Sequence, residues 1–214
     1  KIIYSKHIYL FSFILFIKMD NNTIYKKQIE ILKKKIKPFA PDYEYHNYSH
    51  LLDVFDIVTK LGKKQKLSEH DVFLLQTAAL LHDIVYVKGR EDNEEKSVEF
   101  TKSFLPGLGY SKKDIDSVCD LISVTNLKME PKTKLEQIIR DADIDNLRRK
   151  DFFEKTECLR KEQGVDKNEW YSSYALDFLR NIKFYTTPDY SSGNSVFKKN
   201  LRILSLIKKK GSSK

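Results

Sequence analysis

Apolar positions along this chain recur at intervals of three and four residues, which is the spacing of one face of an α-helix. In residues 25–36, Ile29, Leu32 and Ile36 share one face among lysines, and Pro38 follows them. No stretch alternates apolar and polar residues as a half-buried strand does. The pattern therefore predicts an all-α fold, with helices over 25–36, 45–60, 72–81, 92–104, 111–126, 133–146, 151–162, 167–180 and 195–208, and a loop over 186–193.

Several of these helices begin with the same local signal, a Ser, Thr or Asp followed three positions later by an acidic residue. The first of the two side chains can accept a hydrogen bond from a backbone N–H that has no partner in the first helical turn. With only 7 glycines and 5 prolines, the chain also has few of the tight turns that a many-stranded sheet needs. The pairs are Ser68 with Asp71, Asp92 with Glu95, Ser111 with Asp114, and Thr133 with Glu136.

The length of the chain bears on the number of domains, and its charge bears on nucleic-acid binding. A chain of 214 residues favours a single domain, which we place over residues 19–207. The formal charge of +9 suggests nucleic-acid binding, but seven of the lysines lie in residues 1–18 and 208–214, which leaves +2 for the body. We therefore interpret residues 208–214 as a basic flexible tail. The sequence contains no DNA- or RNA-binding motif.

The first residues need an interpretation of their own. Residues 9–17 are strongly apolar and follow Lys1 and Lys6, as in a secretory signal, but the run is too short to span a bilayer. No small-residue cleavage site precedes Met19, so we interpret residues 1–18 as upstream or non-native sequence, with a signal or membrane anchor as the alternative. Cys119 and Cys158 form no CxxC pair, as expected of reduced thiols in a cytoplasmic protein with no membrane partner.

Histidines and aspartates interrupt the apolar segments, where an unpaired charge is costly to bury. His82 and Asp83 end the most hydrophobic segment, Asp141 and Asp143 lie in another apolar helix, and His50 lies in the predicted helix over 45–60. A divalent cation would offset the charge of the carboxylates. A mixed set of imidazoles and carboxylates suits Zn, Mn, Fe, Ni or Mg, and the lack of clustered thiols argues against a structural cysteine–zinc site.

The order of these residues resembles a known family. His50, then His82 with Asp83, then Asp143 is similar to the H…HD…D signature of the HD superfamily of metal-dependent phosphohydrolases. Residues 45–50 read Tyr-His-Asn-x-x-His, which resembles a signature shared by cyclic-nucleotide phosphodiesterases and a branch of small, largely uncharacterised HD proteins. The length favours the small branch. Residues 81–86, 92–97 and 178–186 also resemble that branch, so the resemblance runs from about residue 45 to residue 204.

The resemblance implies a metal site and roles around it. It assigns His50, His82, Asp83 and Asp143 as ligands of one tightly bound divalent ion. A second ion is possible, although Asn126 stands where related proteins often carry another histidine. The residues expected to orient ligands or to bind the substrate phosphate are Asn47, Arg90, Asn93, Arg140 and Asp141.

Two residues are expected to act on the substrate. His46 resembles the general acid of the phosphodiesterases, and its alternative role is only to hydrogen-bond the metal face. Asp83 is expected to bind the ion or to take a proton from water. Within residues 141–143 the family pattern selects Asp143 as the ligand, and Asp141 is expected to orient a histidine.

The function that the resemblance implies is hydrolysis of a phosphate monoester or diester through a metal-activated water. The expected partner is a small phosphorylated substrate, most simply a nucleotide, although no residue pattern identifies a base or sugar pocket. The alternatives are a non-catalytic metal-binding HD protein and a basic nucleic-acid-binding protein. The sequence does not indicate an oligomeric state.

Overall fold

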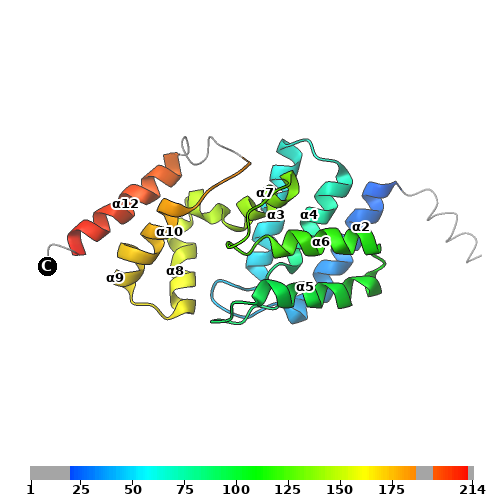
Figure 1. The fold of residues 1–214 in the computed structure, drawn as a ribbon, viewed down its shortest axis with the longest axis horizontal. Helices are drawn as coiled ribbons and strands as arrows, with labels where there is room; N and C mark the ends of the chain where they lie inside the picture. The colour runs from blue at the N-terminus through cyan, green and yellow to red at the C-terminus, as the bar shows by residue number, and fades with distance from the viewer. Residues whose placement is uncertain (1–19, 187–194, 212–214) are drawn as a thin grey trace, which may run out of the picture.

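The computed structural model describes residues 20–186 and 195–211 of the chain, and these residues form a set of packed helices (Figure 1). The predicted extension over 1–18, the predicted loop beyond Thr186 and residues 212–214 lie outside the described part. In chain order the elements are α2 (Asn21–Ile36), η1 (Lys37–Phe39), α3 (Tyr48–Lys64), α4 (Glu69–Leu81), α5 (Asn93–Phe104), η2 (Leu105–Leu108), α6 (Lys112–Ser123), α7 (Lys134–Asp143), η3 (Asp145–Arg148), α8 (Phe152–Gln163), α9 (Lys167–Glu169), the π-helical η4 (Trp170–Tyr174), α10 (Ala175–Asn181) and α12 (Ser195–Gly211).

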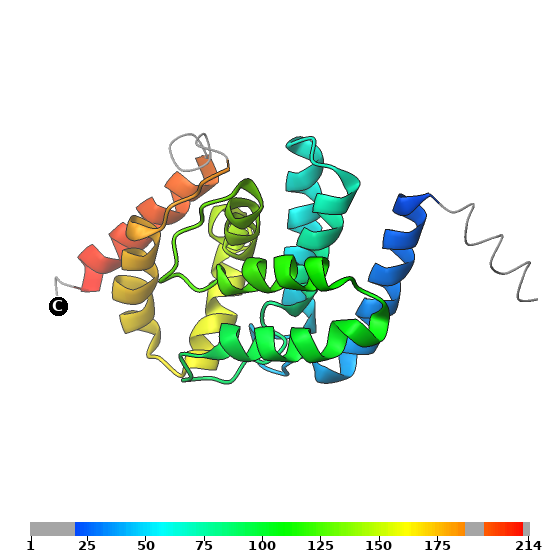
Figure 2. The ribbon, with the colours of Figure 1, turned by 45° about the vertical axis from the view of Figure 1, so that its right-hand side comes forward.

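Helix α4 lies at the centre of the larger group of helices and contacts α2, α3, α6 and α7. Beyond its polar first turn it is apolar on nearly every side, which is the pattern of a helix surrounded by other helices. Leu75, Ala78, Leu80 and Leu81 are fully buried, and each fully buried leucine stabilises the fold by about 1.5–3 kcal/mol. Helices α5 and α6 run side by side along the same group (Figures 1 and 2).

A second apolar cluster lies at the other end of the molecule, where α8, η4, α10 and α12 pack together (Figures 1 and 2). Its buried side chains include Phe152, Trp170, Leu176 and Leu204. The chain passes from the first cluster to the second between Ala142 and Ile144, at the end of α7. Asp143, one of the predicted metal ligands, therefore lies where the two apolar clusters meet.

The predicted all-α fold is confirmed for the described residues, where the only strand-like pairing is an isolated bridge between Asp42 and Asn47. Three predicted helix starts are correct, because Ser68, Ser111 and Thr133 cap α4, α6 and α7 through their side chains. Asp92 precedes α5 but does not cap it, since its carboxylate pairs with Arg90 instead.

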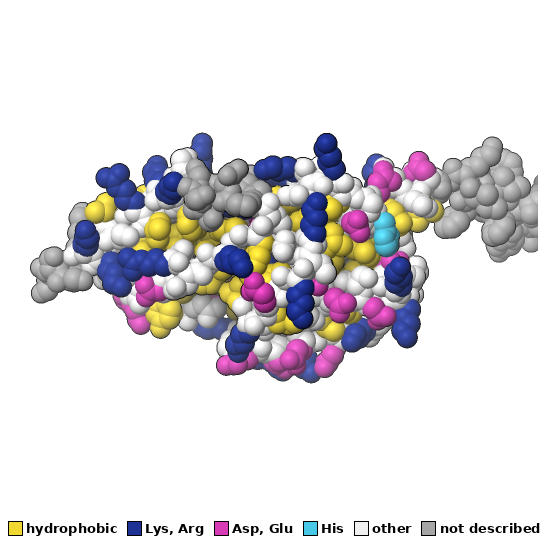
Figure 3. All heavy atoms as spheres, turned by 45° about the horizontal axis from the view of Figure 1, so that its top comes forward, with side chains coloured by type: hydrophobic (Ala, Val, Ile, Leu, Met, Phe, Trp, Pro, Cys, Tyr) yellow, Lys and Arg dark blue, Asp and Glu magenta, His cyan; other side chains and the backbone are white. Residues whose placement is uncertain are grey.

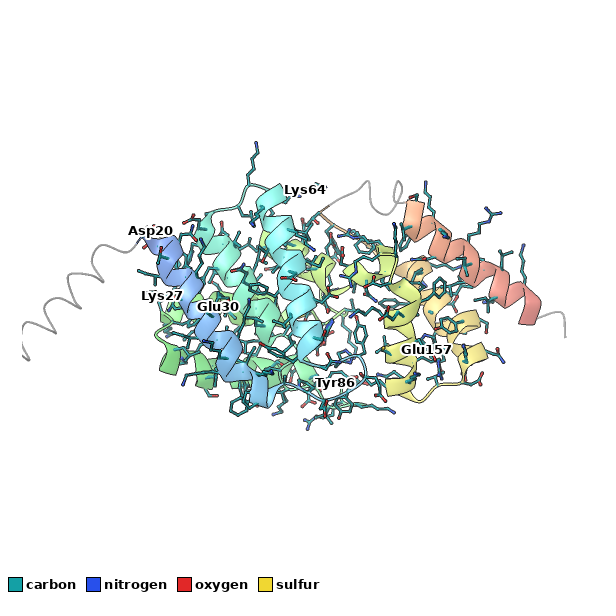
Figure 4. The ribbon with its side chains drawn as sticks, turned by 180° about the vertical axis from the view of Figure 1, so that it is seen from behind. Asp20, Lys27, Glu30, Lys64, Tyr86 and Glu157 are labelled. Carbon is teal, nitrogen blue, oxygen red and sulfur yellow. The ribbon has the colours of Figure 1, made fainter. Side chains whose placement is uncertain are left out.

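The remaining differences concern the helix bounds. Helix α2 begins earlier than predicted, because the carboxylate of Asp20 accepts a hydrogen bond from the N–H of Thr23 (Figure 4). Helix α12 continues to Gly211, so residues 208–211 are helical and not the flexible tail that their charge suggested. Within the described residues, no helix combines the length and the apolar character that crossing a membrane requires.

Candidate metal centre

Three helix ends converge on the polar residues that interrupt the apolar segments. His50 is the third residue of α3, His82 directly follows α4, and Asp143 is the last residue of α7. The start of α3 is fixed by Asn47, whose Oδ1 accepts hydrogen bonds from the N–H groups of Ser49 at 2.9 Å and His50 at 3.2 Å. The predicted supporting role of Asn47 thus takes the form of a helix cap that places His50.

The distances within the cluster suit one ion. His82 Nε2 lies 3.0 Å from Asp83 Oδ2 and 3.3 Å from Asp143 Oδ1. His50 Nε2 lies 3.3 Å from His82 Nε2 and from Asp143 Oδ1, and 3.5 Å from Asp83 Oδ2. Donor atoms that share one ion at about 2.1 Å lie about 3.0–3.4 Å apart, depending on the coordination geometry. The two imidazoles and two carboxylates therefore have the spacing and the chemistry of a divalent metal site.

The orientation of the His82 ring supports this interpretation. Its Nδ1 lies 2.9 Å from the carbonyl oxygen of Ala79, so that nitrogen carries the proton and donates it. The Nε2 lone pair of the neutral ring then faces His50, Asp83 and Asp143. The carboxyl ends of α4 and α7 both point to the cluster, and their partial negative charge favours a cation there.

The electrostatics of the cluster follow from its burial. Burial opposes a charge on His82, which is fully buried, but the carboxylates of Asp83 and Asp143 raise its pKa well above the ordinary value. Burial also opposes ionisation of Asp83, yet the two imidazoles hold the pKa of that carboxyl well below its usual range. The four groups therefore compensate one another, and a divalent ion can take the place of the protons on the imidazoles.

His46 lies beside the cluster but not on α3. The predicted helix over 45–60 is wrong at its start, because Asn47 has an extended backbone and caps a helix that begins at Tyr48. The His46 ring still faces the metal cluster, with Nε2 3.8 Å from Asp83 Oδ2. It reaches this position from the loop before α3, not by stacking one turn below His50.

Glu162 holds His46 in place and was not identified from the sequence. Its side chain is fully buried, and Oε1 lies 2.5 Å from His46 Nδ1. Its Oε2 accepts hydrogen bonds from the backbone N–H groups of Tyr45 at 3.0 Å and His46 at 2.9 Å. Burial opposes ionisation, but these donors hold the pKa of the Glu162 carboxyl at about 2. The only signal for its burial in the sequence was its position on the same side of α8 as Phe152 and Thr156, which are also buried.

Tyr86 packs against the face of the His46 ring. The two rings stack at 3.7 Å between centroids and 16° between planes. The Tyr86 hydroxyl accepts a hydrogen bond from the Gln163 side chain, so Tyr86 lies beside the end of α8 (Figure 4). Glu162 and Tyr86 together fix the plane of the imidazole.

The prediction that Asp141 orients a histidine is wrong. Its carboxylate accepts hydrogen bonds from the N–H groups of Tyr185 and Thr186 and, at 2.6 Å, from the Thr186 hydroxyl. Asp141 and Asp143 point in different directions because neighbours two apart on a helix occupy opposite faces. Asp141 therefore anchors the segment after α10 to α7.

Three further predicted residues have structural contacts that the sequence did not show. Arg140 is buried and donates to the carbonyl oxygens of Val124, Asn126 and Met129, so it closes the loop after α6. Asn93 bonds both the N–H and the carbonyl of Val87. Arg90 is exposed and pairs with Asp92. None of the three contacts His50, His82, Asp83 or Asp143 through a hydrogen bond or ion pair in the described part of the chain.

Glu94 is a second residue near the cluster to which the sequence assigned no role. Burial raises the pKa of its carboxyl, and the charges of Asp83 and Asp143 add to that rise. Asn126 donates to Glu94 at 3.4 Å. The residue that stands in place of an expected histidine thus contacts a carboxylate close to the cluster.

Comparisons with known proteins agree with this arrangement. Residues 47–145 match the sequence model of the HD domain family, and this range contains all four residues of the cluster. The chain is 29% identical over 124 residues to the uncharacterised protein YpgQ of Bacillus subtilis strain 168. That match covers 55% of this chain and 58% of the relative, so it spans little more than half of the relative's length.

Solved structures resemble the fold over more of the chain. A crystal structure of Bacillus subtilis YpgQ in complex with ADP is similar with a TM-score of 0.59 and 19% identity, covering 89% of this chain and 96% of that one. Another crystal structure of YpgQ is similar with a TM-score of 0.61 and 19% identity, covering 85% of this chain and 96% of that one. At 19% identity, the similarity to these structures shows that the fold is shared and nothing further.

Proposed function

We propose that the chain is a metal-dependent phosphohydrolase acting on a phosphate monoester or diester, on the premise that residues 47–145 match the HD domain family, as the motifs predicted. The observation that carries the proposal is the cluster of His50, His82, Asp83 and Asp143, whose ligand atoms all lie within 4.8 Å of one another. The buried carboxylates of such a cluster need a compensating positive charge, which protons on the imidazoles or a bound cation can supply.

The four residues would hold one divalent ion such as Mn, Mg, Ni, Fe or Zn. When bound there, the ion supplies a Lewis acid that acidifies water and neutralises charge on a phosphoryl oxygen. The Asp83 side chain keeps 13% of its surface exposed and lies 3.8 Å from His46, so its carboxylate is placed to accept the proton of the attacking water.

His46 is proposed as the general acid. Its Nδ1 lies against the buried carboxylate of Glu162, which fixes the orientation of the ring. Its Nε2 is then the proton donor on the side of the metal cluster, where it can protonate the departing ester oxygen. Glu162 acts through His46 and is a positioning residue.

A nucleotide is the proposed substrate class. The crystal structure of YpgQ whose fold this chain resembles contains ADP, which supports a nucleotide ligand for this fold. The charge of the body also fits a small substrate better than a nucleic acid, because lysines and arginines are spread over the face in Figure 3 with acidic side chains among them. A non-catalytic metal-binding protein remains the second candidate, since the same cluster would serve it.

Metal-dependent turnover separates the two candidates. Purified protein would be freed of metal, loaded in turn with Mn, Ni, Mg, Fe or Zn, and tested on nucleoside mono-, di- and triphosphates and on bis(p-nitrophenyl) phosphate. We expect phosphate or nitrophenol release that requires the ion and is lost in Asp143→Ala. Full metal binding without turnover of any of these substrates would favour the non-catalytic protein.

A further inference from the structure

A cavity of about 290 Å³ lies next to the metal cluster, between the two apolar clusters. His46 and Asp143 line it on the side of the metal cluster, and the other lining residues are Tyr45, Ile144 and side chains of η3, α8, η4 and α10. Apart from these two residues at the metal end, the lining side chains carry no charge. A phosphate therefore has no cationic partner inside the cavity, whereas an uncharged group attached to that phosphate has the required surroundings.

The cavity wall contains a side-chain amide that no neighbour uses. The side chain of Asn146 lines it and is only 8% exposed, yet its amide makes no hydrogen bond within residues 20–186 and 195–211. No fully covered side-chain nitrogen or oxygen of that part lacks a partner, so the amide of this lining residue retains some accessible surface. A buried amide is expensive to leave unpaired, and it offers one acceptor and one donor group to a ligand.

The hydroxyl of Thr156, which also lines the wall, is already occupied. Thr156 Oγ1 accepts a hydrogen bond from Trp170 Nε1 at 3.1 Å. Away from the metal, the buried amide of Asn146 and the hydroxyl of the exposed Tyr174 are thus the groups available to select a ligand by hydrogen bonding.

The far wall is aromatic and has an unusual backbone. Trp170 and Tyr174 bound the π-helix η4, and their rings stack at 6.0 Å with 23° between planes. Tyr174 is 53% exposed, which is high for an aromatic ring and leaves it accessible at the cavity. π-helical turns within helices are frequent at functional sites, and they shift side chains out of the regular helical positions.

From these features we infer that the cavity binds the nucleobase of the substrate and that Asn146 hydrogen-bonds its polar edge. This inference rests on the proposed phosphohydrolase function and adds the part of the substrate that determines specificity. A nucleobase is flat, uncharged and aromatic, so it stacks on Trp170 or Tyr174. Its edge carries adjacent donors and acceptors, which an asparagine amide matches in pairs. The cavity volume of about 290 Å³ lies at the lower limit for small-molecule sites, as expected for one half of a nucleotide.

Direct binding tests the inference without turnover. Trp170 is the only tryptophan of the chain, so its fluorescence reports on the cavity alone. Adenosine, guanosine, cytidine and uridine would each be titrated into metal-free protein, with ribose as the control, and each titration would be repeated by calorimetry. We expect at least one nucleoside to bind saturably while ribose does not. Binding of none of the four would overturn the inference.

Two variants locate the site. Asn146→Ala removes the free amide and should weaken nucleoside binding by about three- to tenfold, the value of one lost hydrogen bond. Ala175→Phe adds a ring at the cavity wall and should abolish binding. Asn168→Ala, an exposed asparagine on α9, is the matched control and should bind as the wild type does. Thermal melting and metal content show whether each variant is folded, and undiminished binding in a folded Asn146→Ala protein would contradict the inference.

Turnover then separates this inference from the proposed function. The ratio of kcat/KM for a nucleoside monophosphate to that for ribose 5-phosphate should fall in Asn146→Ala. A wild type that binds nucleosides but hydrolyses neither phosphate would contradict the proposed function and leave the cavity assignment standing. A wild type that hydrolyses the nucleoside monophosphate and ribose 5-phosphate with equal kcat/KM and binds no nucleoside would support the proposed function and contradict the cavity assignment.

Discussion

At the scale of single residues, the chemistry depends on how two imidazoles differ. His82 is fully buried, donates from Nδ1 to Ala79 and presents Nε2 to the cluster. His46 is only partly buried, contacts Glu162 through Nδ1 and approaches Asp83 no closer than 3.8 Å. The first arrangement suits a metal ligand and the second suits a proton donor, because only His46 has an acidic partner on the side away from the cluster.

The first prediction concerns His46. His46→Ala should keep its metal and lose roughly a hundredfold or more in kcat on substrates with poor leaving groups, because such leaving groups need a proton. Nitrophenyl esters need little protonation and should lose much less. Metal content and both rates would be measured on the same preparation. Equal losses on the two substrate types with the metal retained would rule out the acid role.

The second prediction concerns the charge of Glu162. Its pKa is lowered from 4.5 to about 2 on folding, so its contribution to stability is fully present above pH 4.5 and lost as the pH falls toward 2. A shift of this size corresponds to at most about 3 kcal/mol. Glu162→Gln should therefore be less stable than the wild type at pH 7, and the difference should shrink at pH 3. Urea unfolding at both pH values measures it, and a difference independent of pH would contradict the assignment.

The sequence predicted the residues of the metal cluster but not the residues that hold them and their neighbours in place. The order of His50, His82, Asp83 and Asp143 could be read from motifs, because they interrupt apolar helices. Glu162 could not be paired with His46, since 116 residues separate them and nothing local marks the contact. The anchoring role of Asp141 depends on Thr186 in the same way.

At the scale of elements, helix ends determine where the polar groups meet. The sequence predicted three caps correctly because the signal is local, a hydroxyl and an acidic residue three positions apart. The predicted start of α3 was too early because aromatic residues before Asn47 continue the apolar pattern. The side chain of Asn47 accepts a hydrogen bond from the N–H of His50, and this cap makes the helix begin at Tyr48. The π-helix over Trp170–Tyr174 has no local signal and lay inside one predicted helix.

The third prediction tests the cap of α7, the helix that carries Asp143. Thr133 Oγ1 accepts from the N–H of Glu136, and the Glu136 carboxylate accepts from the N–H of Thr133. Thr133→Ala should lower the free energy of unfolding by about 1 kcal/mol. Ser103→Ala, at an exposed position inside α5, is the control and should change it little. Urea denaturation of both variants decides, and equal effects would contradict the capping assignment.

At the scale of the whole molecule, the metal cluster and the adjacent cavity lie where two apolar clusters meet. Periodicity identified which side of each helix is buried, but it could not show which helices share a cluster, because that depends on partners distant in sequence. The predicted single domain and the cytoplasmic location stay predictions. The position of Asp143 between Ala142 of one cluster and Ile144 of the other links the site to the packing of both.

The fourth prediction concerns the segment before Met19. Deleting residues 1–18 should leave the melting temperature, the metal content and the turnover unchanged, because this segment carries none of the motifs of the site. Thermal melting and activity of the shortened chain test this. Loss of solubility or of metal-dependent activity would show that the segment belongs to the folded protein.

The most direct test of the central claim is the metal content of His82→Ala compared with His70→Ala. His70 is a partly exposed histidine that pairs with Asp114 on another face, so its removal controls for the loss of an imidazole. After identical loading with Mn and removal of free ion, the wild type and His70→Ala should each hold about one ion per chain, and His82→Ala should bind it about tenfold or more weaker and be inactive. Full occupancy in His82→Ala would contradict the metal site, and with it the proposed hydrolysis.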